Sequence, residues 1–158
     1  MNSAALTVVA LGSNQGDRHA HLAYALHRLA ETFGPLTRSP IFETDPFGVA
    51  VPQPAFLNMV VTLTTDLSAG QVLEQLLAIE HERGRARPFP NAPRTLDLDL
   101  ILHGDTVLSL PHLTVPHPRF RERAFVLEPL AAIAPDLRDP VTGAAVAALW
   151  RALRDGGR

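Results

Sequence analysis

Leucine occupies every second position in one short stretch of the chain: Leu96, Leu98, Leu100 and Leu102. A period of two is typical of a β-strand whose two faces differ in polarity. Asp97 and Asp99 lie between these leucines. The pattern therefore predicts that both carboxylates leave the same face of a strand, with their Cβ atoms about 6.5–7 Å apart.

A second alternation, from Phe56 to Thr65, predicts another strand with two unlike faces. Its apolar face is expected to lie under helices, together with the leucines of the first stretch: Leu57, Met59, Val61 and Leu63. The opposite face carries Phe56 and Asn58. If both strands belong to one sheet, that face brings these two side chains close to Asp97 and Asp99.

The remaining periodicities predict strands at residues 6–11 and 36–43 and helices at residues 18–33 and 68–84. Asp17 is expected to cap the first helix, and Ser68 with Gln71 to form a capping box at the second. This order, β-α-β-β-α-β, predicts an α+β fold of the ferredoxin-like type, with an antiparallel sheet and helices on one face. A C-terminal helical extension is predicted from residues 125–133, interrupted early by Pro129, and residues 144–153.

The glycine-rich segment at residues 12–16, GSNQG, follows a strand and precedes a helix. It matches neither G-x-G-x-x-G nor the P-loop motif, so these residues alone favour a tight turn over a ligand contact.

Composition narrows the classes of function. The length of 158 residues fits one domain, residues 1–158. A net charge of −2 gives no general attraction to nucleic acid or membranes, and no apolar run approaches the roughly 20 residues of a membrane span. The N-terminus lacks the basic segment of a signal peptide, so the cytoplasm is the expected location. We also expect a monomer.

The choice of charged and nucleophilic residues excludes several mechanisms. The sequence has no cysteine, which excludes thiolate chemistry. All 14 basic residues are arginine, which excludes a Schiff-base lysine and a P-loop lysine. Any phosphate must therefore be bound by arginine, backbone amides and metal.

Two neighbouring aspartates on one strand face repel each other unless a cation lies between them. Solvated surface carboxylates and a metal site are about equally probable from the spacing alone. Magnesium suits such a pair because it takes oxygen ligands, and two ions could clamp a phosphoryl-type transfer. Nearby arginines could serve either phosphate binding or an ion-pair network: Arg85, Arg87, Arg94 and Arg123.

Several segments in collinear order resemble the 6-hydroxymethyl-7,8-dihydropterin pyrophosphokinases of folate synthesis. The segments are LGSNQGD (11–17), FLNMV (56–60), GRAR (84–87), RTLDLDLIL (94–102) and LTVPHPRFRERAFVLEPL (113–130). The resemblance extends from about Val8 to Leu137. It implies a ferredoxin-like fold and transfer of pyrophosphate from ATP to the pterin hydroxymethyl group, with release of AMP.

The resemblance also implies roles for individual residues. Asp97 and Asp99 match the aspartates that bind two Mg²⁺ ions, and Arg85 and Arg94 match arginines of the catalytic centre. It implies that the following residues bind the nucleotide: Glu80, Arg87, His112, Thr114, His117 and Arg123. The pterin pocket is implied for Thr44, Asp45, Pro46, Phe47, Asn58 and the aromatic pair Phe56 and Phe125.

Three positions depart from the usual pattern of that family. Asn91 and Ala92 stand where a tryptophan is common, His112 replaces an arginine, and Pro118 replaces a tyrosine of some members. None of these positions belongs to the pair of aspartates.

Two other functions remain open from the residues. One is a metal-dependent phosphohydrolase or nucleotidyltransferase that uses the same aspartates. The other is a non-catalytic RNA-binding module, which should carry basic and aromatic residues at the centre of its open sheet. Acidic residues are predicted there instead.

Overall fold

The computed structural model describes residues 4–44, 55–83 and 95–156. Its centre is an antiparallel sheet built on three long strands, β1 (Ala5–Ser13), β4 (Phe56–Thr65) and β5 (Asp97–His103). β1 pairs with β4 on one side and with β5 on the other, so β5 forms an edge. The fold is α+β and ferredoxin-like, as the order of the elements predicts.

The strand predicted at residues 36–43 is two short strands, β2 (Thr37–Arg38) and β3 (Phe42–Thr44), which both pair with β4. The interruption has a local cause. Ser39 exchanges hydrogen bonds with Val60 through its N–H and its Oγ, 2.9 Å each, and the next residue, Pro40, has no N–H to donate to a ladder. The edge of the sheet is therefore short and bent at this point.

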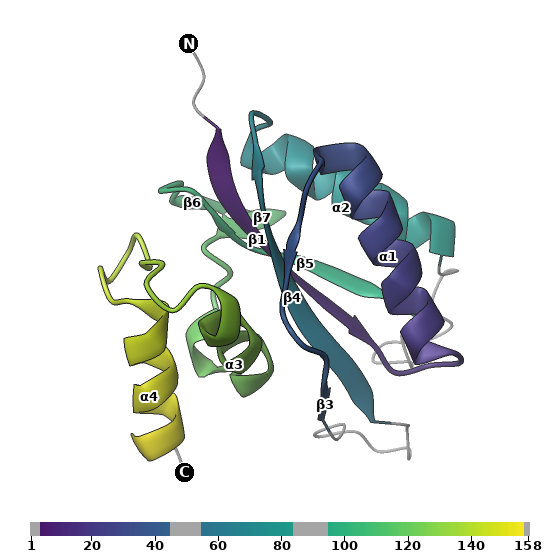
Figure 1. The fold of residues 1–158 in the computed structure, drawn as a ribbon. Helices are drawn as coiled ribbons and strands as arrows, with labels where there is room; N and C mark the ends of the chain where they lie inside the picture. Colours follow the sequence, from purple (N-terminus) through teal and green to yellow (C-terminus); the bar gives the residue numbers. More distant parts are fainter. Residues whose placement is uncertain (1–3, 45–54, 84–94, 157–158) are drawn as a thin grey trace.

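Helices α1 (Arg18–Phe33) and α2 (Ala69–Arg83) lie side by side on one face of the sheet, as Figure 1 shows. Both predicted caps are present: the Asp17 side chain accepts from the Ala20 N–H, and Ser68 and Gln71 bond reciprocally at 2.9 and 3.2 Å. The core under these helices contains the side chains predicted for it from the two alternations: Leu57, Met59, Val61, Leu63, Leu96, Leu98 and Leu100.

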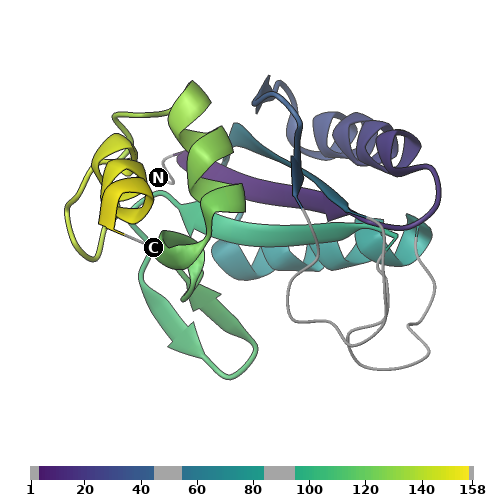
Figure 2. The ribbon, with the colours of Figure 1, turned by 90° about the horizontal axis from the view of Figure 1, so that it is seen from below.

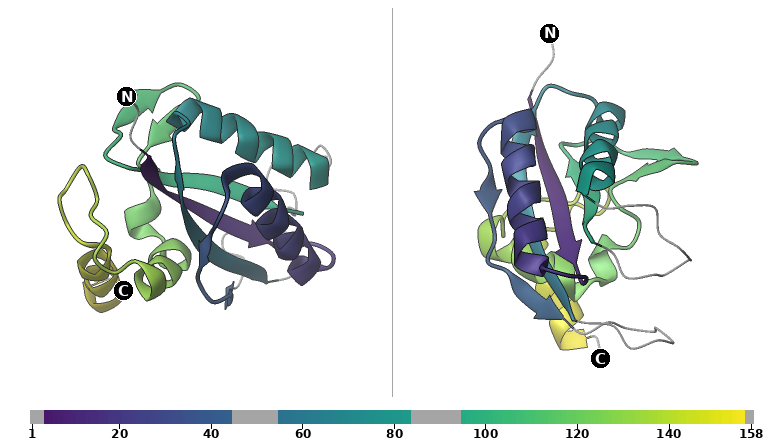
Figure 3. Two further views of the ribbon diagram at one scale, coloured as in Figure 1. Left: turned by 45° about the horizontal axis from the view of Figure 1, so that its top comes forward. Right: turned by 90° about the vertical axis from the view of Figure 1, so that its right-hand side faces the viewer.

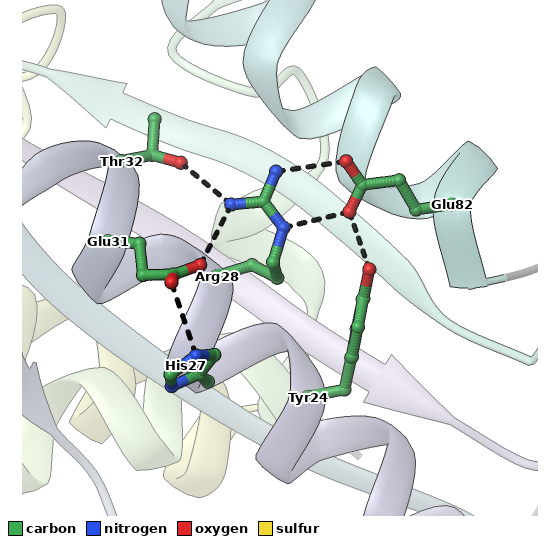
Figure 4. A network of polar contacts seen from close by, with 6 residues as sticks. All are labelled: Tyr24, His27, Arg28, Glu31, Thr32 and Glu82. Atoms are coloured by element: carbon green, nitrogen blue, oxygen red, sulfur yellow. Dashed lines mark hydrogen bonds and ion pairs between the residues drawn. The ribbon is translucent and has the colours of Figure 1, made fainter.

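Polar contacts hold α1 against α2 at the protein surface (Figure 4). The carboxylate of Glu82 accepts two hydrogen bonds from Arg28, at 2.8 and 2.9 Å, and one from the hydroxyl of Tyr24 at 2.5 Å. These bonds lower the pKa of Glu82 to about 2, so the pair stays charged across the neutral range. The last turn of α2 is thereby fixed to the middle of α1.

The C-terminal extension covers part of the second face of the sheet. It consists of the 3₁₀ turn η1 (Phe120–Glu122), α3 (Ala124–Ile133) and α4 (Val146–Gly156). Pro129 lies inside α3 without interrupting it, contrary to prediction. Figure 2 shows α3 and α4 gathered over one end of the strands. A second core forms there: Val8, Ala10, Val60, Ile101, Leu102, Phe120, Val126, Leu127, Leu130 and Val146.

Leu102 lies in this second core, whereas the alternation placed it with Leu98 and Leu100. The reason is a bulge in β5: Val8 is opposite Leu102, but the next residue, Val9, is opposite Leu100. The extra residue, Ile101, shifts the alternation by one position. The strand therefore changes which face its leucines occupy beyond residue 100.

β5 leads through a turn at Gly104 into a separate hairpin, β6 (Leu108–Leu110) and β7 (Leu113–Val115). Figure 3 shows this hairpin projecting beside the end of the sheet. Among the described residues, none of the helices is long and apolar enough to cross a membrane.

The fully buried side chain of Asp139 connects two segments of the C-terminal extension. Its carboxylate accepts hydrogen bonds from Arg121 of η1, from the Val141 N–H at 3.0 Å and from the Thr142 hydroxyl at 2.8 Å. Burial opposes ionisation, but these hydrogen bonds outweigh it and lower the pKa of Asp139 to about 2. The turn before α4 is thus attached to the segment that begins α3.

Asp139→Asn is expected to lower the free energy of unfolding by about 2–4 kcal/mol at pH 7, because it leaves Arg121 without its buried partner. In the unfolded state Asp139 binds a proton below its ordinary pKa of 3.8, whereas in the folded state it binds one only below about pH 2. The stability gap between wild type and variant should therefore be complete above about pH 4 and shrink toward pH 2.

Urea unfolding at several pH values measures this gap. The control is Asp155→Asn, because the Arg154–Asp155 pair is exposed and should change stability by less than about 1 kcal/mol. Equal stability losses in the two variants would contradict the role given to Asp139.

Candidate active site

Residues of β1, β4 and β5, continued by the short strand β3, form one row across the second face of the sheet. We call it the polar row. Gly12 of β1 lies opposite Asn58 of β4 and also opposite Asp97 of β5. Directly opposite residues of antiparallel strands point to the same face. Phe42 of β3 continues the row beyond Asn58, and in the next row Ala10 lies opposite Asp99. The face predicted to carry Asn58 and both aspartates therefore exists.

Gly12 is a part of this row that the sequence alone did not indicate. The GSNQG segment was predicted to be a tight turn, but Gly12 and Ser13 belong to the paired strand β1. A Cβ atom at Gly12 would lie 3.1 Å from Oδ1 of Asn58 and 3.8 Å from Cδ1 of Phe56. The glycine thus allows the Asn58 amide to lie closer to β1 than a larger residue at this position would permit.

Asn58 is held in one orientation within the row. It is 7% exposed, and its Nδ2 donates to the Thr44 hydroxyl at 2.6 Å. Thr44 pairs with Phe56 in the β3–β4 ladder, so the three side chains come from adjacent positions of two strands. With Nδ2 bound to Thr44, the acceptor Oδ1 lies on the Gly12 side. The arrangement offers one fixed acceptor beside an aromatic ring.

Two residues predicted to bind the nucleotide contact the backbone of β5 along its outer edge. Glu80 of α2 accepts a hydrogen bond from the Leu98 N–H at 2.6 Å, between the two aspartates. The N–H of His117 donates to the Ile101 carbonyl at 2.9 Å, two residues beyond Asp99. Both contacts satisfy backbone groups of an edge strand. They also bring Glu80 and His117 to either side of the Asp99 position.

His117 is neutral at physiological pH. Burial lowers its pKa first, and the positive charges of Arg123 and Arg119 lower it further. Its Nδ1 accepts the Arg119 N–H at 3.2 Å, which leaves the proton of the neutral ring on Nε2. His117 therefore offers a hydrogen-bond donor without adding a positive charge.

Arg123 and Phe125 lie at the start of α3. The guanidinium of Arg123 lies over the Phe125 ring, 5.4 Å from its centroid, and Phe125 is 37% exposed. Helix α3 packs against β4 and β3, the strands of Phe56, Asn58 and Thr44. In the segment before α3, Thr114 belongs to β7 and is half-buried, whereas His112 precedes β7 and is exposed.

Two half-buried carboxylates, Asp97 and Asp99, are the oxygen donors of this face. Among the described residues, no group of three or more histidine, aspartate or glutamate side chains could hold a metal. A pair of carboxylates with room for other oxygen ligands is the donor set that suits Mg²⁺, which completes its shell with water and phosphate. The residues present therefore fit magnesium together with a phosphorylated ligand.

Residues 8–135 match the family described as 7,8-dihydro-6-hydroxymethylpterin-pyrophosphokinase (HPPK). This chain belongs to the HPPK family. The match covers β3, β4 and β5, β1 from Val8 onward, and both segments that border the edge of β5.

Individual relatives of the HPPK family are similar over most of the chain. One from Pseudomonas aeruginosa is 48% identical over 135 residues, which cover 84% of this chain and 82% of the relative. One from Bacillus subtilis is 43% identical over 143 residues, with coverage of 88% and 84%. Both are named 2-amino-4-hydroxy-6-hydroxymethyldihydropteridine pyrophosphokinase.

The fold is also similar to a solved structure, that of wild-type Plasmodium falciparum HPPK-DHPS. The TM-score is 0.75 at 14% sequence identity, and the likeness covers 99% of this chain. The chain spans 47% of the length of that protein. At this level of identity the comparison supports the ferredoxin-like HPPK fold.

Six of the residues predicted for an HPPK site lie outside the described residues: Asp45, Pro46, Phe47, Arg85, Arg87 and Arg94. Seven of the others fall into two groups, one on the second face of the sheet and one along its β5 edge. Phe56 and Asn58 border Gly12, Thr44 holds the Asn58 amide, and Asp97 and Asp99 lie on the same face. Glu80 and His117 flank the edge. No hydrogen bond or ion pair between described residues joins His112, Thr114, Arg123 or Phe125 to either group, although Arg123 contacts Phe125.

Proposed function

We propose that the row through Gly12 is where this chain transfers pyrophosphate from ATP to the hydroxymethyl group of 6-hydroxymethyl-7,8-dihydropterin, releasing AMP. Pyrophosphoryl transfer to hydroxymethyldihydropterin in folate biosynthesis is the activity of its family. The observation that carries the location is the register of the sheet, which places Asn58 and Asp97 opposite the same glycine.

The pterin binds on the Asn58 side of the row. A flat heterocycle is held well by stacking on aromatic rings, and Phe56 and Phe125 supply rings that are not fully buried. Oδ1 of Asn58 accepts a hydrogen bond from an N–H on the edge of the pterin. Without a Cβ atom at Gly12, the ring can approach the sheet between Asn58 and Asp97.

The phosphates bind on the β5 side. Asp97 and Asp99 would hold two Mg²⁺ ions, which when bound neutralise the charge that develops on the phosphate oxygens. The hydroxymethyl oxygen attacks the β-phosphorus of ATP and loses its proton to solvent, the bond from that phosphorus to the oxygen of AMP breaks, and AMP leaves. Such a transfer depends mainly on positioning and charge neutralisation.

The nucleotide lies along the outer edge of β5. Glu80 and the Nε2–H of His117 border that edge on either side of Asp99. Arg123 supplies positive charge from the start of α3, and Arg85, Arg87 and Arg94 supply more. Thr114 and His112 complete the nucleotide side. The single domain at residues 1–158, the monomeric state, the cytoplasmic location and the absence of nucleic-acid and membrane partners stay predictions.

ATP is expected to be converted to AMP only when hydroxymethyldihydropterin is present. Asp97→Asn should reduce this turnover by about 10³-fold, because a metal ion contributes several kcal/mol to transition-state stabilisation and each 1.36 kcal/mol is tenfold. Chromatographic separation of AMP, ADP and orthophosphate measures both effects. Chelation of Mg²⁺ should stop the reaction in the same assay.

The control is Asp105→Asn, an exposed aspartate in the turn that follows β5. It should keep wild-type turnover. Release of orthophosphate without pterin would indicate a phosphohydrolase instead. Full activity of Asp97→Asn would contradict the role of Asp97 in binding Mg²⁺ for the transfer.

Gly12→Ala is expected to raise the KM for the pterin about tenfold while the KM for ATP changes less than twofold. The added methyl group would occupy the space beside Asn58, whose amide is bound to Thr44 and cannot retreat freely. Steady-state kinetics with each substrate varied separately measures the two constants.

Gly70→Ala is the matched control, since a Cβ atom there meets nothing closer than 4.0 Å. Unchanged pterin kinetics in Gly12→Ala would mean that the ring does not lie over this glycine.

A further inference from the structure

Arg18, the first residue of α1, connects the two strands that carry the pterin-side residues. Its Nη1 donates to Oε2 of Glu43 at 3.0 Å and to the carbonyl oxygen of Ala55 at 2.8 Å. Glu43 lies in β3, and Ala55 directly precedes β4. One guanidinium nitrogen thus bridges the end of one strand and the beginning of its neighbour.

Each contact of Arg18 is one residue away from a side chain of the polar row. Glu43 precedes Thr44, and Ala55 precedes Phe56. Thr44 in turn holds the amide of Asn58 at 2.6 Å. β3 is an edge strand of three residues, too short to fix these positions by its own ladder. A contact from outside the ladder is therefore needed to hold it in register.

We infer that Arg18 is a positioning residue for the pterin side of the site, acting through Glu43 and Ala55, an inference that rests on the function proposed above. The guanidinium fixes the distance between β3 and the start of β4, and with it the spacing of Thr44 and Asn58 from the Phe56 ring. Among the contacts that the structure describes, Arg18 reaches neither the aspartates nor the edge of β5. Its effect is therefore confined to one of the two substrates.

A contact that only stabilised the fold would act differently. The same helix offers a matched comparison in Arg28, whose side chain is 26% exposed against 27% for Arg18. Arg28 also bridges two elements, but it joins α1 to α2 through Glu82 and reaches neither β3 nor β4. Truncation of Arg28 removes the ion pair of an equally exposed arginine that makes more side-chain hydrogen bonds than Arg18. Since only Arg18 reaches β3 and the start of β4, only Arg18 should affect the pterin.

The test measures kcat and the KM of each substrate for wild type, Arg18→Ala and Arg28→Ala, with equilibrium binding of the pterin by its fluorescence. Arg18→Ala should raise the KM and the Kd for the pterin about tenfold and leave the KM for ATP and kcat within twofold. Arg28→Ala should leave all four within twofold. Arg18→Lys keeps one charged donor and should raise the pterin KM about threefold, which provides a second variant if Arg18→Ala does not fold.

A pterin KM within twofold of wild type in Arg18→Ala would overturn the inference, as would equal increases for pterin and ATP. So would an Arg28→Ala variant with the same pterin defect. Wild-type protein that forms no AMP from ATP and pterin would instead refute the proposed function. The two failures are thus distinguishable in the same set of assays.

Discussion

The register of β1 between β4 and β5 is the constraint on which the site depends. Because the three strands are antiparallel and paired without a gap at this level, Asn58, Gly12 and Asp97 point to one face at adjacent positions. A slip of one residue in either ladder would turn Asn58 or both aspartates into the apolar core. The same packing of leucines that stabilises the sheet under α1 and α2 therefore fixes the polar row on the other side.

The rest of the described molecule defines the borders of this row. The C-terminal extension covers the sheet where Val8, Val60 and Leu102 are apolar, and its own attachment depends on the buried Arg121–Asp139 pair. Glu80 and the segment of His117 satisfy the outer edge of β5. The two carboxylates on one face provide oxygen ligands of the kind that Mg²⁺ prefers, so this face suits a complex with cations and phosphates.

Alternation in the sequence was sufficient to predict the faces of β4 and most of β5, because the strand period is two and one face is buried. It was not sufficient at Leu102, where the bulge at Ile101 depends on pairing with Val8 and Val9 and leaves no local signal. The break at Ser39 could have been suspected from Pro40, because proline has no N–H to donate to a strand ladder. The roles of Gly12, Arg18 and Glu80 arise from contacts between residues far apart in the chain. Family resemblance indicated Glu80, whereas Gly12 and Arg18 required the register and the helix position.

The most direct test is a crystal structure with a nonhydrolysable ATP analogue, Mg²⁺ and hydroxymethylpterin. The account predicts Mg²⁺ at about 2.0–2.1 Å from carboxylate oxygens of Asp97 and Asp99. It also predicts the pterin ring over Gly12, with an N–H donating to Oδ1 of Asn58 and the triphosphate on the β5 side. Mg²⁺ bound away from both aspartates, or a pterin that does not contact Asn58, would contradict it.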